Sequence, residues 1–457
     1  MAKELKKFAH PEYLAVLPDY VRIRDCFKGE RAIKEAGTAY LPRLKAQSED
    51  DYTNYLYRAL FFPITGKTVT SMVGMATTRE PKVEYPDLLD AYFKDDDGTY
   101  QFTEFYVGVF TEVILMGRYG VLIDAPLTEG EPTLVPYIAE NVVNWDHFDD
   151  GRLKMLLLRE YRRVPGDDKF EVKTVCSYRH CFIDVDGVYK VEILDDDLQA
   201  SAPPVVPTFS GQPIDFIPWT PFGASGVHMS VDKPPMQDIS TINISHYLTS
   251  ADLEWGRHIV GLPTPVVSGV DSSTKLSIGG TAAWVLPVIE AKAYYLEFLG
   301  QGLQSLEKAM TEKVGLMASI SARLVDNSTR GSEAAETVRL RYISESASLI
   351  HIIGAIESGM VMMYNMLAKL KRVDGTVKIA FSREILGIGI TFKDLAVLFE
   401  AYLNGSVSKE TLLYNMRRLD AVDPNRTDEQ ELAAIKEPPK PAPNNPSPAA
   451  PPKAPGA

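Results

Sequence analysis

The sequence predicts an α+β fold, and three observations carry this prediction. Apolar residues recur every three or four positions before residue 75 and again between residues 301 and 371, which is typical of amphipathic helices. Residues 130–194 are instead rich in strand signals, with alternation at period two. A small β-rich stretch at 262–300 separates two long helical segments. The chain is therefore neither all helix nor all strand.

Composition limits the function classes. The 457 residues are 45% hydrophobic and 24% charged, which is ordinary for a globular protein with a sizeable core. Lys and Arg total 48 against 61 Asp and Glu, so the formal net charge is −13. Because phosphate contacts need clustered positive charge, this balance excludes a general nucleic-acid binder. The same acidity suits a surface that nucleic acid passes without adhering.

The first 75 residues predict helices. Tyr52, Leu56 and Leu60 recur at helical spacing, and Pro63 predicts a kink or break. The N-terminus has no apolar stretch of the signal-peptide kind, so we expect no secretory signal. Three cysteines in a chain this long do not form a disulfide framework, which favours a reduced intracellular setting.

The middle of the chain predicts one helix and then strands. A helix over 102–115 ends at Gly117, and residues 119–123 form a buried strand. A second strand covers 153–164. Alternation from Phe170 to Tyr178 predicts a half-buried strand, and Asp186-Gly187 predicts a hairpin turn. The remaining stretch, 195–220, predicts a looser, Pro-containing connection.

Three long helices dominate the second half, over residues 234–260, 301–325 and 336–371. The polar residues 326–335 predict a loop between the last two. Helical pieces resume after a Gly-rich connection at 387–389. The last segment, 437–457, is Pro-rich and predicts a disordered or polyproline-like tail.

The apolar run from Leu349 to Leu367 resembles a membrane span in composition. It contains His351 and Glu357, and a central Glu is expensive in lipid. We therefore expect a buried helix and no membrane partner.

Metal and cofactor motifs are incomplete. Gly66-Lys67-Thr68 resembles the end of a phosphate-binding loop, but position 61 is Phe where that loop needs Gly. Asp95, Asp97, Gly98 and Glu104 fit part of a calcium loop whose first ligand position is Phe93, so an acidic helix-capping turn is favoured. We expect no cofactor.

Two further clusters point to no chemistry. Strand alternation puts Cys176 and His180 on one face and Cys181 on the other, which disfavours zinc and leaves no metal site. His147 lies near several aspartates, as acidic surface turns often do, without a nucleophile beside it. The sequence therefore gives no positive sign of an enzyme.

Several runs, taken together, resemble the portal proteins of tailed bacteriophages, and more narrowly a portal-like family catalogued as a phage domain of unknown function. The similarity covers about residues 35–400. The most telling run lies between Asp238 and Gly269. It contains Asn243, His246-Tyr247, Ser250-Ala251-Asp252, Trp255-Gly256 and Pro263-Thr264-Pro265-Val266-Val267. Earlier matching runs are Tyr40-Leu41-Pro42-Arg43-Leu44, 52–59, Phe61-Phe62, 116–124 and 140–145.

The resemblance implies the portal fold, mapped here by order along the chain. An α/β wing with N-terminal helices covers 1–230, followed by a two-helix stem, a β-rich clip, a tunnel loop with a long helix, and a short helical crown. The implied segments after the wing are 234–260 (first stem helix), 262–300 (clip), 301–325 (second stem helix), 326–335 (tunnel loop), 336–371 (long helix), 372–436 (crown) and 437–457 (Pro-rich tail).

The resemblance also implies a function without hydrolysis. Copies would form a ring, a dodecamer, at one capsid vertex of the virion after assembly in the host cytoplasm. Double-stranded DNA would be packaged and ejected through its channel. The implied partners are the terminase large subunit, the head–tail adaptor, and the major capsid and scaffolding proteins.

Three sets of residues are candidates for these roles. Transient DNA phosphate contacts are expected from Asn327, Ser328, Thr329 and Arg330, unless Arg330 pairs with Glu333 or a neighbouring copy. Terminase and adaptor docking is expected at Val267, Asp271, Lys275 and Trp284. Because closing a ring needs head-to-tail interfaces, an apolar stripe is expected to contact the neighbouring copy through Leu303, Leu306, Met310 and Met317.

Charges along 301–335 balance, so the polar side of this helix and the loop after it could form a near-neutral band that touches DNA without gripping it. The balanced residues are Lys308, Lys313, Arg323 and Arg330 against Glu307, Glu312, Asp326 and Glu333. Two alternatives remain open: another head–tail structural protein, such as an adaptor or minor capsid protein, and an intracellular enzyme with a deep pocket.

Overall fold

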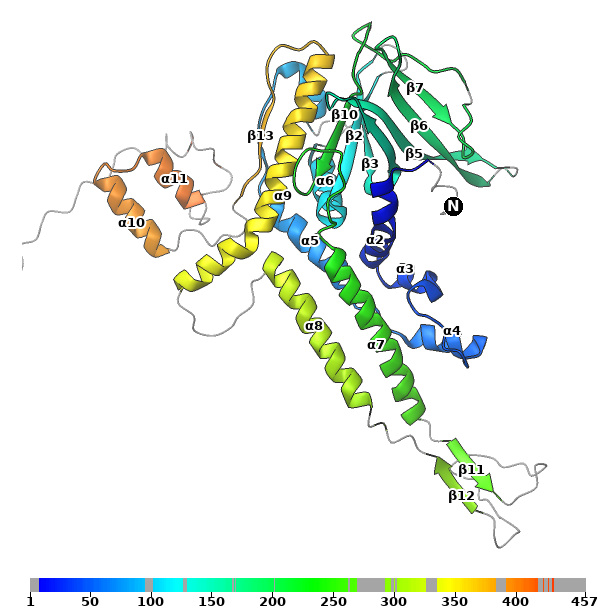
Figure 1. The fold of residues 1–457 in the computed structure, drawn as a ribbon. Coiled ribbons are helices and arrows are strands. Elements are labelled where there is room, and N and C mark those ends of the chain that lie inside the picture. Colours follow the sequence, from blue (N-terminus) through cyan, green and yellow to red (C-terminus); the bar gives the residue numbers. More distant parts are fainter. Residues whose placement is uncertain are drawn as a thin grey trace, which may run out of the picture. The chain divides into compact units, whose positions relative to one another are not determined.

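The chain is described here from a computed structural model, in two compact units, Met1–Arg383 and Glu384–Ala457, each taken by itself (Figure 1). Within them the structure describes residues 8–94, 102–125, 130–166, 168, 170–200, 202–261, 264–268, 292–296, 300, 302–325, 335–383, 392–417, 422, 426 and 430.

Helices fill the N-terminal part, as predicted. In chain order they are α2 (Pro11–Lys28), α3 (Glu30–Glu35), the single turn η1 (Gly37–Ala39), α4 (Glu49–Arg58) and α5 (Ile64–Ala76). Ser48 caps α4, because its Oγ accepts from the backbone N–H of Asp51 at 3.1 Å. Pro63 is the residue that precedes α5, so the predicted break is confirmed.

A three-stranded antiparallel sheet follows the predicted helix α6 (Phe102–Met116). Gly117 ends α6 with φ +70° and leads into β2 (Arg118–Asp124), as predicted. The sheet order is β10-β2-β3, with β3 (Thr133–Ile138) and β10 (Trp219–Gly223) at its edges. Strand β10 was not predicted, because Pro221 interrupts its strand signal.

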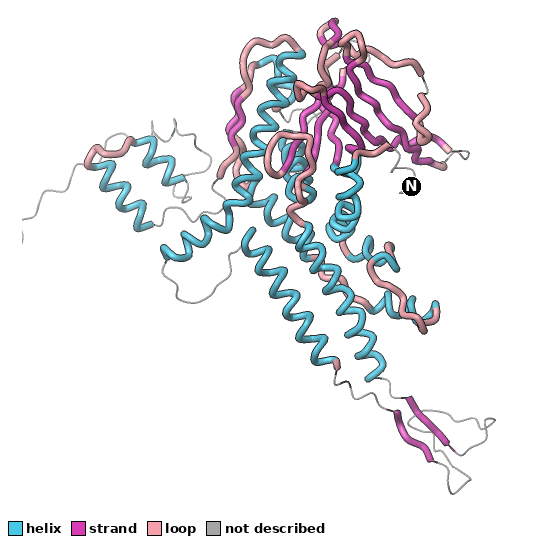
Figure 2. Tube along the Cα trace, viewed as in Figure 1, coloured by secondary structure: helices cyan, strands magenta, loops and turns pink. Residues whose placement is uncertain are grey.

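A second antiparallel sheet has the order β4-β5-β6-β7 (Figure 2). Its strands are β4 (Val142–His147), β5 (Leu153–Pro165), β6 (Val172–Ile183) and β7 (Tyr189–Leu194). Gly187 has φ +77° in the turn before β7, which confirms the predicted hairpin. The half-buried alternation predicted from residue 170 is wrong at the start of β6, where residues 172–175 are all exposed.

One buried core of unit 1 lies between the two sheets and α2. Tyr13 from α2, Trp145 and Leu156 from the second sheet, and Trp219 from the first sheet all pack into one buried cluster. Both faces of the second sheet are covered near its middle, since the consecutive residues Leu156, Leu157 and Leu158 are all buried. Short elements around it are η2 (Asp87–Tyr92), η3 (Ala139–Asn141), β8 (Thr208–Phe209) and β9 (Gln212–Pro213).

The predicted helix–insert–helix order is present. Helix α7 (Gln237–Gly261) is followed by an antiparallel strand pair, β11 (Thr264–Ser268) with β12 (Lys292–Leu296), and then by α8 (Leu303–Val325). We call these elements the α7–α8 arm. At about 1.5 Å per residue the two helices are about 38 Å and 35 Å long. The third long helix, α9 (Ala335–Leu370), is also as predicted.

Helix α9 packs on the first sheet through Gly359. A Cβ added there would lie 2.6 Å from the ring of Phe222 on β10, so this close approach requires glycine. Its segment Ala347–Leu370 is long and apolar enough to cross a membrane by length and composition, and half of that stretch is buried inside the protein. Glu357 accepts the backbone N–H of Phe381 at 2.9 Å, a contact typical of a core helix.

The end of unit 1 is a strand that the sequence did not predict. β13 (Lys378–Ala380) pairs with β1 (Lys82–Glu84), although almost three hundred residues separate them. Unit 1 therefore extends to Arg383, whereas the crown was expected to begin at residue 372. The described helices of unit 2 are α10 (Phe392–Leu403) and α11 (Lys409–Arg417).

Candidate functional site: the α7–α8 arm

Helix α7 is buried on nearly all sides between residues 239 and 253, and its polar side chains hold the N-terminal helices. Asn243 donates to the carbonyl of Phe62 at 2.8 Å and accepts from the hydroxyl of Thr65 at 2.9 Å. Ser250 accepts the backbone N–H of Leu60 at 3.1 Å. The non-helical link between α4 and α5 thus has its backbone groups satisfied by α7, as buried backbone requires.

The same helix binds α2 and α4. Ser240 accepts from the Arg22 guanidinium at 3.3 Å, and Asp252 accepts the hydroxyl of Tyr55 at 2.6 Å. Trp255 packs edge-on against Tyr55, with ring centroids 6.0 Å apart. The residues that carry the family resemblance on α7 therefore have a structural explanation, because they hold α2, α4 and α5 in place.

Helix α8 runs back along α7. Lys313 donates to the Ser245 carbonyl at 2.9 Å and to the Thr249 hydroxyl, and Arg257 pairs with Glu307 at 2.8 Å. A Cβ at Gly256 would lie 2.6 Å from Cδ2 of Leu303, so this leucine of α8 packs directly over the glycine of α7. Lys313 was expected on a near-neutral polar band, but it is turned into the α7–α8 interface.

His246 is the unusual group in this interface. Its side chain is buried, and its Nδ1 has no hydrogen-bond partner among the residues that the structure describes. Burial, and secondarily the charge of Lys313, lower the pKa of His246 below its ordinary value. Phe62 lies across from it at 6.0 Å. The folded protein therefore favours the neutral imidazole.

Acidification is expected to weaken this interface. A lowered pKa in the folded state means that stability is complete above the unfolded value of about 6.5 and is lost as pH falls through the folded pKa. The melting temperature should therefore fall more between about pH 7 and pH 5 in the wild type than in His246→Gln. His147→Gln, which replaces an exposed histidine outside this interface, is the matched control and should leave the pH profile of the wild type unchanged. Identical pH profiles for wild type and His246→Gln would contradict the assignment.

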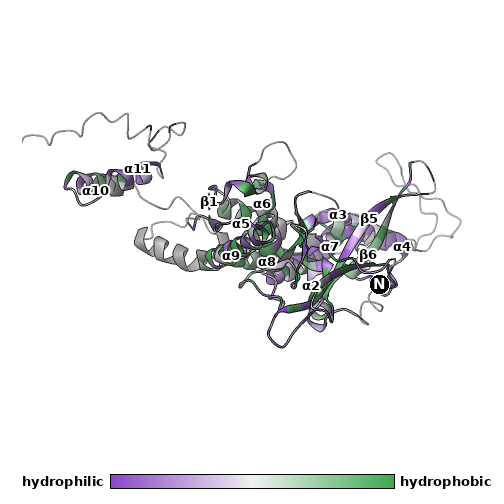
Figure 3. Cartoon of the chain, turned by 90° about the horizontal axis from the view of Figure 1, so that it is seen from above, coloured by the Kyte–Doolittle hydropathy of each residue, from purple (hydrophilic) through white to green (hydrophobic). Residues whose placement is uncertain are grey.

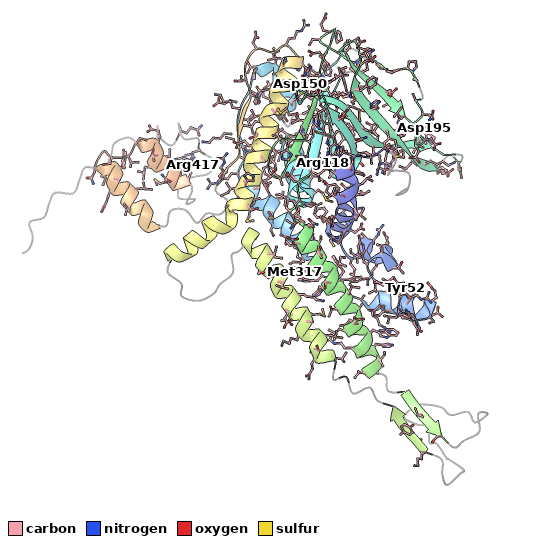
Figure 4. All side chains as sticks on the ribbon, viewed as in Figure 1. Tyr52, Arg118, Asp150, Asp195, Met317 and Arg417 are labelled. Carbon is pink, nitrogen blue, oxygen red and sulfur yellow. The ribbon has the colours of Figure 1, made fainter. Side chains whose placement is uncertain are left out.

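The predicted ring-interface residues lie mainly on the inner side of α8. Met317 is fully buried within the chain, and Leu303 lies against α7. Met317 therefore offers no free surface, which corrects the expectation for it, whereas Leu303 is only partly buried and its contact with a second copy stays a prediction. Contact of a second copy with Leu306 and Met310, which are partly exposed, stays a prediction. Met317 is labelled in Figure 4.

The outward side of α8 is mixed: polar residues predominate, but Val314 and Leu316 are also exposed on this helix. Gln304, Lys308, Glu312 and Ser319 are exposed there, and Lys308 lies 3.9 Å from Glu312.

Among the predicted docking residues, Val267 lies on β11 opposite Ala293 and is partly buried. The other candidate site residues lie outside the described part of the chain: Asp271, Lys275, Trp284, Asn327, Ser328, Thr329 and Arg330.

The structure gives the incomplete motifs no ligand-binding geometry where it describes them. Gly66, Lys67 and Thr68 lie inside helix α5 and not on a phosphate-cradling loop. Cys181 is buried in the core and His180 contacts Glu192 at 2.7 Å, while Cys176 lies on the other strand face from Cys181. Asp95, Asp97 and Gly98 lie outside the described residues.

The cysteine thiols and His147 likewise show no ligand-binding geometry in the described part of the chain. Burial raises the pKa of Cys26 and of Cys181 to about 12, so both are unreactive at neutral pH. Beside His147, Asp146 contacts Lys154 at 3.1 Å, and Asp150 pairs with Arg152 at 2.7 Å. The carboxylates of Asp146 and Asp150 therefore pair with these cations and not with the His147 imidazole. Within the described residues no group of His, Cys, Asp and Glu could hold a metal ion.

The sequence did not predict a cluster of Ser, His and Asp side chains that the structure brings together. Ser225 Oγ lies 2.7 Å from His228 Nε2 and also 2.7 Å from Asp232 Oδ1, while Ser230 Oγ lies 2.8 Å from His228 Nδ1. These three side-chain contacts are satisfied together when Ser230 donates to Nδ1, Nε2 donates to Ser225, and Ser225 donates to Asp232. The imidazole then cannot take the serine proton. The cluster stabilises a turn and is not a nucleophile with its base.

Comparison with known proteins adds a family match over the arm. Residues 235–369 match the family described as "Domain of unknown function (DUF4055)", which spans α7, the strand pair, α8 and almost all of α9. A search among curated proteins finds no sequence match.

Solved structures with a distant likeness come from gene transfer agent particles. A chain of "Virion of native gene transfer agent (GTA) particle" is 13% identical, with 88% of this chain and 97% of that chain covered, at TM-score 0.36. A chain of "Neck of empty GTA particle computed with C6 symmetry" is 13% identical, covering 83% and 92%, at 0.38. A chain of "Neck of native GTA particle computed with C12 symmetry" is 14% identical, covering 89% and 99%, at 0.37. At TM-scores this low the likeness does not define a shared fold.

Proposed function

We propose that this protein is a phage portal subunit, which forms a ring at one capsid vertex and has no catalytic activity of its own. The observation that carries the proposal is the α7–α8 arm. Two long helices run back along each other, the chain crosses between them through a β-strand pair, and a third long helix returns to the body. This is the stem, clip and long-helix order that the portal resemblance implies, and the family match covers the same segment.

The packing within the arm supports a rigid stem. Lys313, Arg257 and the Gly256–Leu303 contact fix the alignment of α8 on α7, so the two helices form one unit. The exposed side of α8, which carries polar residues together with Val314 and Leu316, could form a channel wall or contact a neighbouring copy. The net charge of −13 on every copy opposes adhesion of DNA to such a wall.

The partners follow from the proposal. The strand pair β11–β12 and the residues between its strands would dock terminase and then the head–tail adaptor. Residues 326–334 would contact the passing double-stranded DNA. The capsid and scaffolding proteins would surround the ring in the virion.

The mass of the assembled protein tests the ring. Light scattering and negative-stain imaging of the full chain should show a ring of about 600 kDa, twelve times 50.7 kDa. A compact monomer or dimer with a substrate-binding pocket would favour an enzyme, and a smaller ring that binds only assembled heads would favour an adaptor. Either result at all protein concentrations would contradict the portal proposal.

Deleting Ser272–Gly280 tests the role of the insert. Because this segment lies between β11 and β12, its removal should leave the helix contacts of the arm and the ring intact. Binding of terminase to the ring should be lost. If the deletion prevents ring formation, the division between stem and clip is wrong.

A further inference from the structure

Strands β5 and β6 continue as a two-stranded ribbon beyond the rest of their sheet. β4 pairs with β5 only up to Leu158, and β7 pairs with β6 only from Tyr178 onward. The pairing of β5 with β6 nevertheless extends to Pro165 opposite Val172. We call residues 161–165 and 170–176 the distal ribbon (Figure 1). A two-stranded ribbon is marginally stable in water unless something packs on it.

Large apolar side chains of the distal ribbon are exposed. Tyr161 is 53% exposed, Phe170 87%, Val172 63% and Val175 47%. Hydrophobic residues accompany hydrophilic ones along these strands in the hydropathy view (Figure 3). By register Tyr161 and Val172 lie on one face of the ribbon and Val175 on the other, so this short ribbon exposes apolar side chains on both faces. Exposed apolar surface of this kind marks interaction sites.

One face of the distal ribbon continues a face that the chain itself covers. By register and alternation, Tyr161 and Val172 share the face of Tyr178. Phe8 packs edge-on against Tyr178 at 5.4 Å, and Tyr13 of α2 binds Arg159 on the same face. The cover that Phe8 and α2 provide reaches Tyr178 and Arg159. The same face continues past this point through Tyr161, Arg163 and Thr174 to Val172.

The distal ribbon also carries positive charge. Arg162 and Arg163 are both exposed, and neither has an ion pair with any residue that the structure describes. The whole chain carries a net charge of −13. Two unpaired guanidinium groups beside an apolar patch are thus complementary to the acidic surface of another copy of the same chain.

We propose that the adjacent copy of this chain covers the distal ribbon in the assembled ring. The inference rests on the proposed function, since a closed ring needs a head-to-tail contact between two different patches. The distal ribbon is one of these patches, and it meets a different, predominantly acidic surface on the next copy. It thereby supplies exposed apolar surface that the buried Met317 of α8 cannot.

The test uses the full-length protein with a photo-crosslinking amino acid at position 172. Irradiation of the assembled protein should join copies into dimers and higher multiples. The same crosslinker at Val185, a fully exposed valine in the turn before β7, is the matched control and should give no such products. The position of the crosslink on the second copy, read by mass spectrometry, should differ from the distal ribbon.

Two variants provide a second measurement. Val172→Asp and the pair Arg162→Glu with Arg163→Glu should each reduce the fraction of protein in rings by about tenfold, at the concentration where half the wild type is assembled. The melting temperature of the unassembled chain should not change, because these side chains are exposed in it. Val185→Asp should assemble as the wild type does.

The outcomes separate this inference from the proposed function. Rings that form without crosslinks at position 172, or with crosslinks to DNA or to another protein there, would overturn the inference and leave the portal proposal standing. If the protein forms no ring but position 172 still joins two copies, the contact is real and the portal proposal fails.

Discussion

Replacing Arg24 with methionine is expected to destabilise unit 1 by about 3–5 kcal/mol. Arg24 on α2 binds Glu112 of α6 through two hydrogen bonds of 2.7 Å and Glu140 through bonds of 2.7 and 2.9 Å. The side chains are only 14–16% exposed. Without the guanidinium, two largely buried carboxylates face each other without a counter-charge, and the contact between α2, α6 and η3 is lost.

Urea unfolding followed by circular dichroism measures the effect. The triple variant Arg24→Met, Glu112→Gln, Glu140→Gln should recover most of the stability, because the uncompensated charges are gone. Arg31→Met is the surface control: its pair with Glu35 is 89% and 65% exposed, so the loss should be below about 0.5 kcal/mol. A loss near that of the control for Arg24→Met would show that the network is not buried in solution.

Gly120→Ala is expected to cost about 3 kcal/mol or more, at or above the upper end for overpacking. Gly120 lies in the middle of β2, and a Cβ there would lie 1.9 Å and 2.2 Å from ring atoms of Trp219 on β10. Trp219 is buried in the core between the sheets, and its Nε1 points to Met229 at 3.1 Å. The indole cannot move aside without displacing the residues around it.

The matched control for this variant is Gly108→Ala. Gly108 lies inside helix α6, and a Cβ there would meet nothing within 4 Å. Alanine is the better helix former, so this variant should gain up to about 1 kcal/mol. Thermal unfolding of both variants, with Trp fluorescence as the probe, should therefore show shifts of opposite sign. A tolerated Gly120→Ala would mean that β2 and β10 do not approach as closely as described.

Local patterns predicted the elements that depend on their own sequence. The helix from Phe102 ends at Gly117 because a single glycine in the αL conformation is enough to end a helix. The turn at Asp186-Gly187 likewise depends only on its own two residues. The long helices α7, α8 and α9 were predicted for the same reason, since their periodicity extends over many turns.

Features that need a distant partner were not predictable. β13 is three residues long and exists because it pairs with β1, for which Lys378 gives no local signal. The stripe on α8 was correctly identified as apolar, but periodicity cannot say whether α7 or another copy covers it. The start of β6 alternates as a half-buried strand does, yet the described chain leaves it uncovered at Val172 and Val175.

The polar contacts of α7 at the candidate site could not be predicted either, because they too depend on distant partners. Asn243, Ser250 and Asp252 were noticed because they resemble a family pattern. Asn243 and Ser250 bind backbone groups of a link nearly two hundred residues earlier, and Asp252 accepts from the Tyr55 hydroxyl on α4. No spacing within α7 reveals them. The signal that could have found them is the conjunction of several polar residues on a helix otherwise apolar enough to be buried.

These contacts have a consequence for how the protein is made. The backbone of the link between α4 and α5 finds its partners on Asn243 and Ser250, which follow it by 181 and 190 residues. At about 5–20 residues per second, a ribosome needs about 10–40 s to synthesise that intervening chain. During this interval α4, which carries the exposed Tyr57, has been synthesised but lacks its contacts with α7. The nascent N-terminal half is therefore the stage of synthesis that most needs a chaperone.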